Sequence, residues 1–257
     1  MSKRIELSLE KYETFLSVIK ALKDSCTDLS IRNGMICQTD DLSKAIFKID
    51  LSPVFGERVN LLMSSIKVKY DLLETFRKQR VPMSLEFDER GYSFQDTVSR
   101  LYFVSPVEQF INPSNRFIPQ EDLDRKLSLE EEIILEYTFE SLILKRLHAF
   151  VRGLSATRIM IEFKNGFATW KVLPSDKSMN TVGDLSRVEV NVDIEGIAVF
   201  TTQPFLIGVE ELKSKIFYQQ GKTKLLLQLT SELGNDIKVP IDIWGISNLV
   251  ENNTLCV

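Results

Sequence analysis

The residues that most often carry out chemistry are sparse in this chain. It has one histidine, His148, which falls inside a predicted helix and which we interpret as a packing residue. A Ser-His-Asp triad or a histidine-rich metal site would have only this residue to use. The three cysteines, Cys26, Cys37 and Cys256, are far apart and show no CxxC or zinc-ligand spacing. We therefore expect reduced thiols and no metal or cofactor.

Catalytic motifs are also missing from the sequence. The patterns GxxxxGK[ST], GxGxxG, HExxH and GxSxG, which bind phosphates, dinucleotides or zinc or carry a nucleophile, do not occur. A paired-carboxylate site stays open as an alternative, because the sequence does not show which of the 36 acidic residues meet in space. No motif favours an enzyme, so we predict a non-enzymatic protein.

Lysine and arginine are the residues whose placement suggests a function. The chain as a whole is acidic, with a formal net charge of −4, so it has no overall basic footprint for nucleic acid. Four predicted helical segments, 9–23, 65–80, 140–158 and 207–224, nevertheless each carry net positive charge. Such side chains bind phosphates in a salt-sensitive and sequence-independent way. We assign candidate DNA contacts to Lys11, Lys20, Lys67, Arg77, Lys78, Lys145, Arg152 and Lys215.

The first half of the chain alternates helix and strand patterns. A helix is predicted at 9–22 and a second at about 67–78, the latter burying Val68, Leu72 and Phe76. Between them, Asn33-Gly34 separates two short strands, which is a strong hairpin signal. Further strands are predicted over 43–51 and 59–64, and two more around a turn at Arg90-Gly91 end this half.

The second half repeats this order of elements. A strand at 133–139 precedes a helix at about 140–154, and a second Asn-Gly pair, Asn165-Gly166, lies 132 positions after the first. Strands at 187–194 and 197–205, a fourth helix at about 207–218 and a final hairpin turning near Gly234 follow. A duplicated unit accounts for this better than chance.

The repeat predicts an α+β protein of two similar domains, each with two helices backed by antiparallel sheets. We place the domains at 1–104 and 128–257, joined by a connector at 105–127. The connector is rich in proline and polar residues, yet it also contains Phe110, Ile111, Phe117 and Ile118, which we expect to pack against something. No apolar run has the length of a membrane span and the N-terminus has no apolar leader, so we expect an intracellular, cytoplasmic protein with no membrane contact.

This arrangement resembles the DNA sliding-clamp family, in particular the two-domain proliferating cell nuclear antigen and the processivity factors of tailed phages. The resemblance covers roughly residues 3–245 and rests on the duplicated element order, the connector and the helix charge. It implies a closed homotrimeric ring around duplex DNA, which holds a DNA polymerase on its template and can require a clamp loader. It also implies a pocket for partner peptides, to which Phe117, Ile118, Ile243 and Trp244 correspond.

Two other interpretations remain open. Herpesvirus-type processivity factors are similar to one clamp subunit but work as monomers or dimers; they tend to be strongly basic, and the charge of −4 therefore favours a ring. The other alternative is a β-rich viral structural or assembly protein without a DNA role.

Overall fold

The structure is a computed structural model. It describes residues 3–41, 45–56, 59–77, 83–87, 91–104, 118, 132–176, 182–190, 194–218 and 224–250. By contacts the chain divides into two compact units. Unit 1 consists of 1–43, 47–120 and 232–241, and unit 2 consists of 44–46, 121–231 and 242–257. The predicted connector, 105–127, lies outside the described residues except for Ile118.

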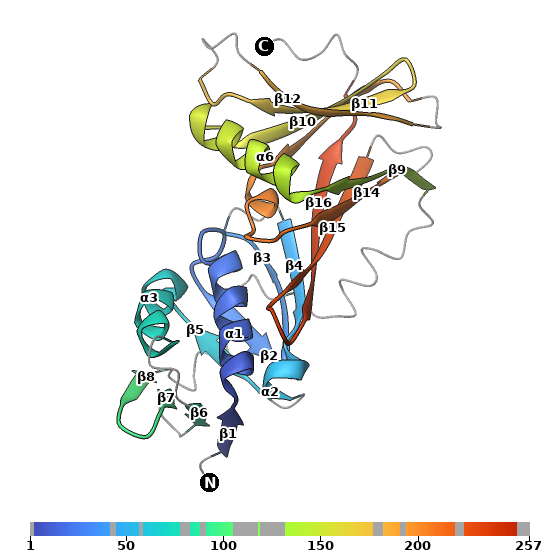
Figure 1. The fold of residues 1–257 in the computed structure, drawn as a ribbon. Coiled ribbons are helices and arrows are strands. Elements are labelled where there is room, and N and C mark those ends of the chain that lie inside the picture. The colour runs from blue at the N-terminus through green and yellow to red at the C-terminus, as the bar shows by residue number, and fades with distance from the viewer. Residues whose placement is uncertain are drawn as a thin grey trace. The chain divides into compact units, whose positions relative to one another are not determined.

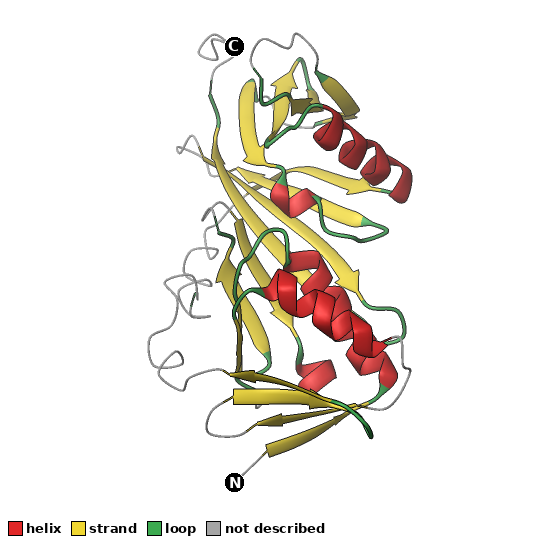
Figure 2. Ribbon diagram, turned by 90° about the vertical axis from the view of Figure 1, so that its left-hand side faces the viewer, coloured by secondary structure: helices red, strands yellow, loops and turns green. Residues whose placement is uncertain are grey.

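The first half of the chain contains eight strands and three helices among its described residues (Figure 1). In chain order these are β1 (Lys3–Leu7), α1 (Leu9–Leu22), β2 (Leu29–Arg32), β3 (Met35–Thr39), β4 (Ala45–Asp50), α2 (Ser52–Phe55), β5 (Leu61–Met63), α3 (Ile66–Arg77), β6 (Met83–Phe87), β7 (Gly91–Gln95) and β8 (Arg100–Val104). Helices α1 and α3 pack against each other on one side of the strands of unit 1 (Figure 2).

The second half follows a similar order. It contains β9 (Glu132–Phe139), α6 (Ser141–Gly153), β10 (Arg158–Lys164), β11 (Phe167–Leu173), β12 (Gly183–Glu189), β13 (Gly196–Thr201), a short 3₁₀ helix η1 (Gln203–Phe205), β14 (Leu212–Tyr218), β15 (Lys224–Leu233) and β16 (Val239–Asn248). The strand predicted at 187–194 thus begins four residues earlier than expected, as β12.

Strand order confirms the predicted duplication of the fold. One sheet has the order β1-β6-β7-β8, and the eight-stranded sheet contains the corresponding order β9-β14-β15-β16 read from its end. Likewise β5-β2-β3-β4, the other part of the eight-stranded sheet, corresponds to β13-β10-β11-β12 in the third sheet. The registers agree, because the last residue of the strand that precedes each long helix, Leu7 of β1 or Phe139 of β9, pairs with the first residue of the neighbouring strand, Met83 of β6 or Leu212 of β14.

Both predicted Asn-Gly hairpins are confirmed. Asn33 and Gly34 have φ of 51° and 77°, and Asn165 and Gly166 have φ of 53° and 74°. A two-residue turn with positive φ at both positions suits the twist of the flanking strands, and asparagine and glycine adopt it at the least cost. These turns join β2 to β3 and β10 to β11.

The predicted fourth helix at 207–218 is wrong. The structure has η1 at 203–205 and then strand β14, which lies between β9 and β15. Leu212, Ser214 and Ile216 are buried on one face of β14, and the lysines between them are on the other. This period of two competes with the helical spacing of Val209, Leu212 and Ile216, and the two paired neighbours decide in favour of the strand.

Each unit has its own aromatic core. In unit 1, Phe15 of α1 stacks on Phe94 of β7 at a centroid distance of 5.8 Å. In unit 2, Trp170 of β11 meets Phe139 and Phe205 edge to face, at 5.0 and 5.9 Å. Large buried rings of this kind provide much of the apolar area that a domain removes from water. They fix α1 against its sheets in unit 1 and hold η1 against β9 and β11 in unit 2.

The C-terminal segment adds to the edge of β13. Ile197 and Val250 exchange two backbone hydrogen bonds, at 2.8 and 2.9 Å, and the Ser247 hydroxyl accepts one from the Val199 backbone N–H at 2.9 Å. Gly196 leaves room for the Leu249 side chain, which a Cβ at position 196 would meet at 2.9 Å. The chain therefore covers an edge strand that would otherwise expose its hydrogen-bonding groups.

Candidate nucleic-acid interface

Helix α1 places its lysines beside acidic residues. The helix begins at Ser8, whose hydroxyl accepts a hydrogen bond from the Lys11 backbone N–H at 3.3 Å. Lys11 is half-buried and Lys20 is exposed, while the same helix carries Glu10 and Glu13. A hydrogen bond from the Ser8 side chain, together with a backbone one, lowers the pKa of Glu10, so this carboxylate stays ionised. The four charges on α1 therefore cancel.

Helix α3 carries basic residues that already have acidic partners. The Lys67 ammonium lies 3.7 Å from Asp24, and Arg77 lies 2.5 Å from Glu74, one turn earlier on the same helix. The helix also carries Asp71, which is exposed. Lys78, another candidate predicted for this region, lies outside the described residues.

The buried face of α3 differs from the one predicted. Ile66 and Leu73 are buried, whereas Val68 and Leu72 are 61% and 42% exposed. The inward position between them is taken by Lys69, whose ammonium lies over the rings of Tyr92 and Phe103.

Lys69 is held inside unit 1 by aromatic residues. Its ammonium donates to the Tyr92 hydroxyl at 3.2 Å and lies 4.9 Å from the centroid of Phe103. Burial lowers the pKa of Lys69, and the nearby carboxylate of Asp28 opposes this shift. Burial also raises the pKa of Tyr92. This lysine is therefore occupied in packing α3 against β7 and β8.

Helix α6 is the most basic of the described helices. Lys145, Arg146 and Arg152 are all exposed, and residues 141–153 include no acidic residue. Leu144, Leu147 and Val151 form its buried face. Lys145 and Arg152 are seven residues apart and so lie on the same side of the helix. Arg146, which sequence analysis left out of the site, lies next to Lys145 in the chain and faces a different part of the solvent.

His148 has the structural role predicted for it. Its Nε2 lies 3.1 Å from the Phe205 carbonyl oxygen, which can only accept, so Nε2 carries the proton. The half-buried ring thereby links α6 to η1.

The lysine predicted for the fourth helix lies on a strand instead. Lys215 is on β14 and its ammonium is 2.9 Å from Glu136 of β9, its partner in the register. Lys213, on the same face of β14, lies 3.5 Å from Glu211. Both lysines are therefore paired on the surface of a sheet.

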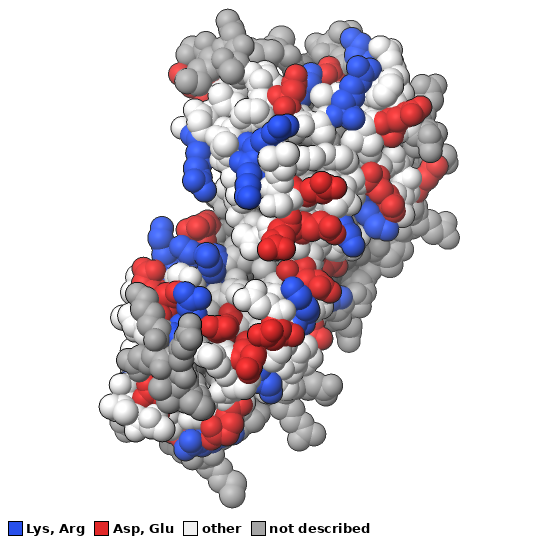
Figure 3. Space-filling model, in the orientation of Figure 1, with Lys and Arg blue, Asp and Glu red and all other residues white. Residues whose placement is uncertain are grey.

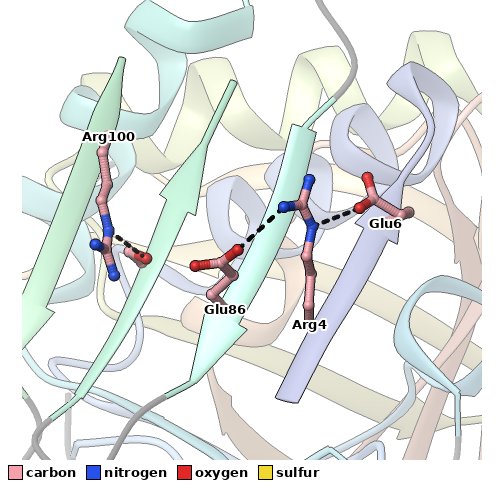
Figure 4. A network of polar contacts seen from close by, with 5 residues as sticks. Arg4, Glu6, Glu86 and Arg100 are labelled. Atoms are coloured by element: carbon pink, nitrogen blue, oxygen red, sulfur yellow. Dashed lines mark hydrogen bonds and ion pairs between the residues drawn. The ribbon is translucent and has the colours of Figure 1, made fainter. Parts of the chain in front are cut away.

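The charge distribution is visible on the molecular surface. In Figure 3, Lys and Arg gather over α6, whereas basic and acidic side chains alternate over α1 and α3. The exposed face of the sheet β1-β6-β7-β8 is also balanced (Figure 4): Arg4 lies between Glu6 at 2.6 Å and Glu86 at 3.3 Å, and Arg100 donates to Ser93 at 2.9 Å. Helix α6 thus has the clearest excess of positive charge among the described helices.

The residues predicted to bind partner peptides have different surroundings. Ile118 is 8% exposed and its backbone N–H donates to the Cys37 carbonyl oxygen at 3.0 Å, so this part of the connector packs on β3. Ile243 is 1% exposed in the core, and neighbouring strand residues such as Trp244 face the opposite side of the sheet. Phe117 lies outside the described residues.

Trp244 belongs to an apolar row on the sheet of unit 2. Its ring stacks on Phe217 of β14 at 5.9 Å, and Phe217 pairs in register with Leu226 of β15 and Ile133 of β9. Ile133 is 44% exposed. The indole N–H of Trp244 is buried and has no hydrogen-bond partner among the described residues. An apolar row of this kind suits the apolar side chains of a bound peptide.

The described residues contain no cluster of three or more His, Cys, Asp or Glu side chains placed to hold a metal ion. Among the described helices, none has both the length and the apolar character needed to cross a bilayer.

Comparison with solved structures identifies the fold. Proliferating cellular nuclear antigen from Entamoeba histolytica matches over 96% of this chain and 98% of its own, with a TM-score of 0.61 at 12% identity. The chain has the sliding-clamp fold. PCNA from A. fulgidus, solved with the C-terminal region of FEN-1 bound, matches over 98% of this chain and 100% of its own, with a TM-score of 0.60 at 10% identity.

A beta clamp is similar to the chain as well. The H. pylori beta clamp, in complex with diflunisal, matches over 96% of this chain and 66% of its own, with a TM-score of 0.55 at 11% identity. No protein-family model matches the sequence, and a search of curated proteins gives no match. The sliding-clamp fold is therefore recognised here through topology, because a fold can persist when residue identity has fallen to this level.

Proposed function

We propose that this protein is a DNA sliding clamp: copies of the chain close into a ring around duplex DNA and tether a DNA polymerase to it. The observation that carries the proposal is the duplicated sheet order together with two of the edge strands, β8 and β12, each of which has one neighbouring strand among the described residues. The proposed role is mechanical, and it requires neither a catalytic residue nor a cofactor.

The internal repeat provides a template for ring closure. In the eight-stranded sheet β16 is the neighbour of β4. By the duplication, β8 corresponds to β16 and β12 corresponds to β4, yet β8 and β12 are both edge strands among the described residues of one chain. Pairing β8 of one copy with β12 of the next would repeat the internal arrangement and leave neither edge exposed.

Exposed apolar side chains support association at these edges. On unit 1, Tyr102 and Val104 of β8 are 39% and 68% exposed, and helix α3, which meets β8 through Lys69 and Phe103, also exposes apolar side chains. On unit 2, Val182 precedes β12 and is 47% exposed. Large apolar side chains that gather on a surface in this way are typical of an interaction site.

We propose a homotrimer, in which three two-domain chains supply six repeats. Its native mass is then about three times 29.5 kDa, which sedimentation or native mass spectrometry measures directly. A sliding clamp of this kind also raises the number of nucleotides that a DNA polymerase adds per binding event. A monomer at all concentrations would favour the herpesvirus-type alternative, and a trimer without any effect on polymerases would favour a structural protein.

Partner binding is proposed for the side of unit 2 that carries Trp244. One solved structure with this fold is described as PCNA bound to the C-terminal region of FEN-1, and by analogy we propose that short peptides of DNA-processing proteins bind here. The row formed by Trp244, Phe217 and Ile133 supplies apolar contact area. Ile118 and Phe117 of the connector remain candidates for the same role.

A further inference from the structure

We propose that α6 carries the phosphate contacts of each chain, with Arg146 acting beside Lys145 and Arg152, and that the basic residues of α1, α3 and β14 contribute little. This inference rests on the proposed function, because it names which of the candidate DNA contacts operate. The sequence predicted four equivalent basic helices, whereas this inference assigns the phosphate contacts to one helix per chain.

The first line of support is the availability of the three α6 side chains. All three are exposed, and no ion pair or side-chain hydrogen bond holds any of them among the described residues. Residues 141–153 of α6 contain no acidic residue, and the exposed Glu140 lies at the N-cap, so phosphate meets less repulsion beside Lys145 and Arg152 than on α1 or α3. Ala149 and Gly153 are exposed between the basic residues, and no atom of another element lies within 4 Å of a Cβ built at Gly153. A DNA backbone can therefore approach the helix closely.

The second line of support is that the other basic residues are engaged. Lys67 and Lys23 both lie near Asp24, at 3.7 and 3.9 Å, and Arg77 is paired with Glu74. A basic residue that already has an acidic partner must give up that partner or bring its negative charge close to the phosphate. Either way, it releases fewer counterions from DNA than an unpaired residue does.

Lys69 and the lysines of β14 are also engaged within the chain. Lys69 is turned inward against Tyr92 and Phe103. Lys215 and Lys213 are paired with Glu136 and Glu211. On α1, the exposed Lys20 shares its helix with two glutamates. Of the predicted contacts that the structure describes, only Lys145 and Arg152 combine exposure with a helix that has no acidic residues.

The inference can be tested with two matched triple variants. One replaces the α6 residues, Lys145→Gln, Arg146→Gln and Arg152→Gln, and the other replaces Lys20→Gln, Lys67→Gln and Arg77→Gln. Both remove three positive charges from exposed helix positions. Binding of the full chain to a fluorescent duplex is measured by anisotropy between about 50 and 200 mM salt, the range over which phosphate contacts weaken most.

We expect the α6 variant to lower the slope of log affinity against log salt by about 0.9 for each phosphate that the chain no longer neutralises. The control variant should change the slope by less than the amount expected for a single phosphate. The single change Arg146→Gln should also reduce the magnitude of this slope. Arg146→Lys keeps the charge and should leave the slope as it is in the unmodified chain. Circular dichroism and melting temperature establish that each variant is folded.

Two failures are distinguishable in this experiment. If both triple variants bind with equally reduced affinity, or if the α6 variant binds like the original chain, the assignment to α6 is wrong while the clamp proposal stands. If the unmodified chain shows no salt-dependent binding to duplex DNA, the proposed function itself is wrong, and the inference fails with it.

Discussion

At the scale of single residues, side chains have roles that their types alone do not reveal. Lys69, Lys145 and Lys215 are all lysines within segments predicted to be basic helices. Lys69 lies over aromatic rings, Lys145 is exposed, and Lys215 is paired with Glu136 on the neighbouring strand. The sequence supplies the number of charges, but partners distant in the chain decide which of them remain available. Arg146 was missed although its place in a helix without acidic residues is readable from the sequence.

A glycine shows how one residue can fix a contact between segments. Gly234 has a φ of 94° at the turn of the β15–β16 hairpin, where the Thr14 hydroxyl of α1 donates to the Ile237 carbonyl oxygen at 3.1 Å. A Cβ at position 234 would collide with that carbonyl and lie 2.8 Å from the Thr14 hydroxyl. Glycine is required here for both its backbone conformation and its size.

Gly234→Ala is therefore expected to lower the free energy of unfolding by about 1–3 kcal/mol, because the backbone strain cannot be relieved without moving α1. Gly153→Ala is the matched control: the position is exposed, and alanine favours helix by up to roughly 1 kcal/mol. Urea denaturation of both variants measures the difference. Equal stability of the two would contradict the close packing of this turn on α1.

At the scale of elements, the sequence predicted what local chemistry decides. The Asn-Gly turns, the long helices α1, α3 and α6 and most strands follow from positive φ, capping and periodicity, which act over a few residues. The predicted buried face of α3 was wrong because the Lys69 side chain packs inward on aromatic residues of β7 and β8. The prediction of a fourth helix was wrong because β9 and β15 supply hydrogen bonds on both sides of β14. No local sequence pattern reveals these two neighbours.

The edge strands permit a test at this scale. Tyr102→Glu with Val104→Glu places charge on the exposed side chains of β8, where a neighbouring copy would need an apolar contact. We expect this variant to dissociate at concentrations at least about tenfold higher than the unmodified chain, as measured by sedimentation velocity, which corresponds to about 1.4 kcal/mol of association free energy. Ile133→Glu, which alters an exposed apolar residue on β9, should leave the native mass unchanged. Equal effects of the two changes would remove β8 from the proposed interface.

At the scale of the whole molecule, the fold was recognisable from the sequence because the two halves repeat the same order of helices and strands. The hairpin turns Asn33-Gly34 and Asn165-Gly166 are 132 positions apart, and β1 and β9 each lead directly into a long helix. What the order of elements does not reveal is the charge of the two halves. Helix α6 is strongly basic and α1 is balanced, so the duplicated units have diverged in their electrostatics while they kept the same strand order.

A ring and a surface binder respond differently when DNA is cut. A clamp threaded onto linear duplex is held by topology once both ends carry bulky blocks, and its retention should depend only weakly on salt. Cutting the DNA between the blocks opens a path for sliding, so we expect release within the time of the digestion, detected as disappearance of protein from the DNA fraction in gel filtration. A protein bound only through charged contacts behaves in the opposite way, because salt removes it and cutting does not. Retention after cutting would therefore contradict encirclement even if the native mass were that of a trimer.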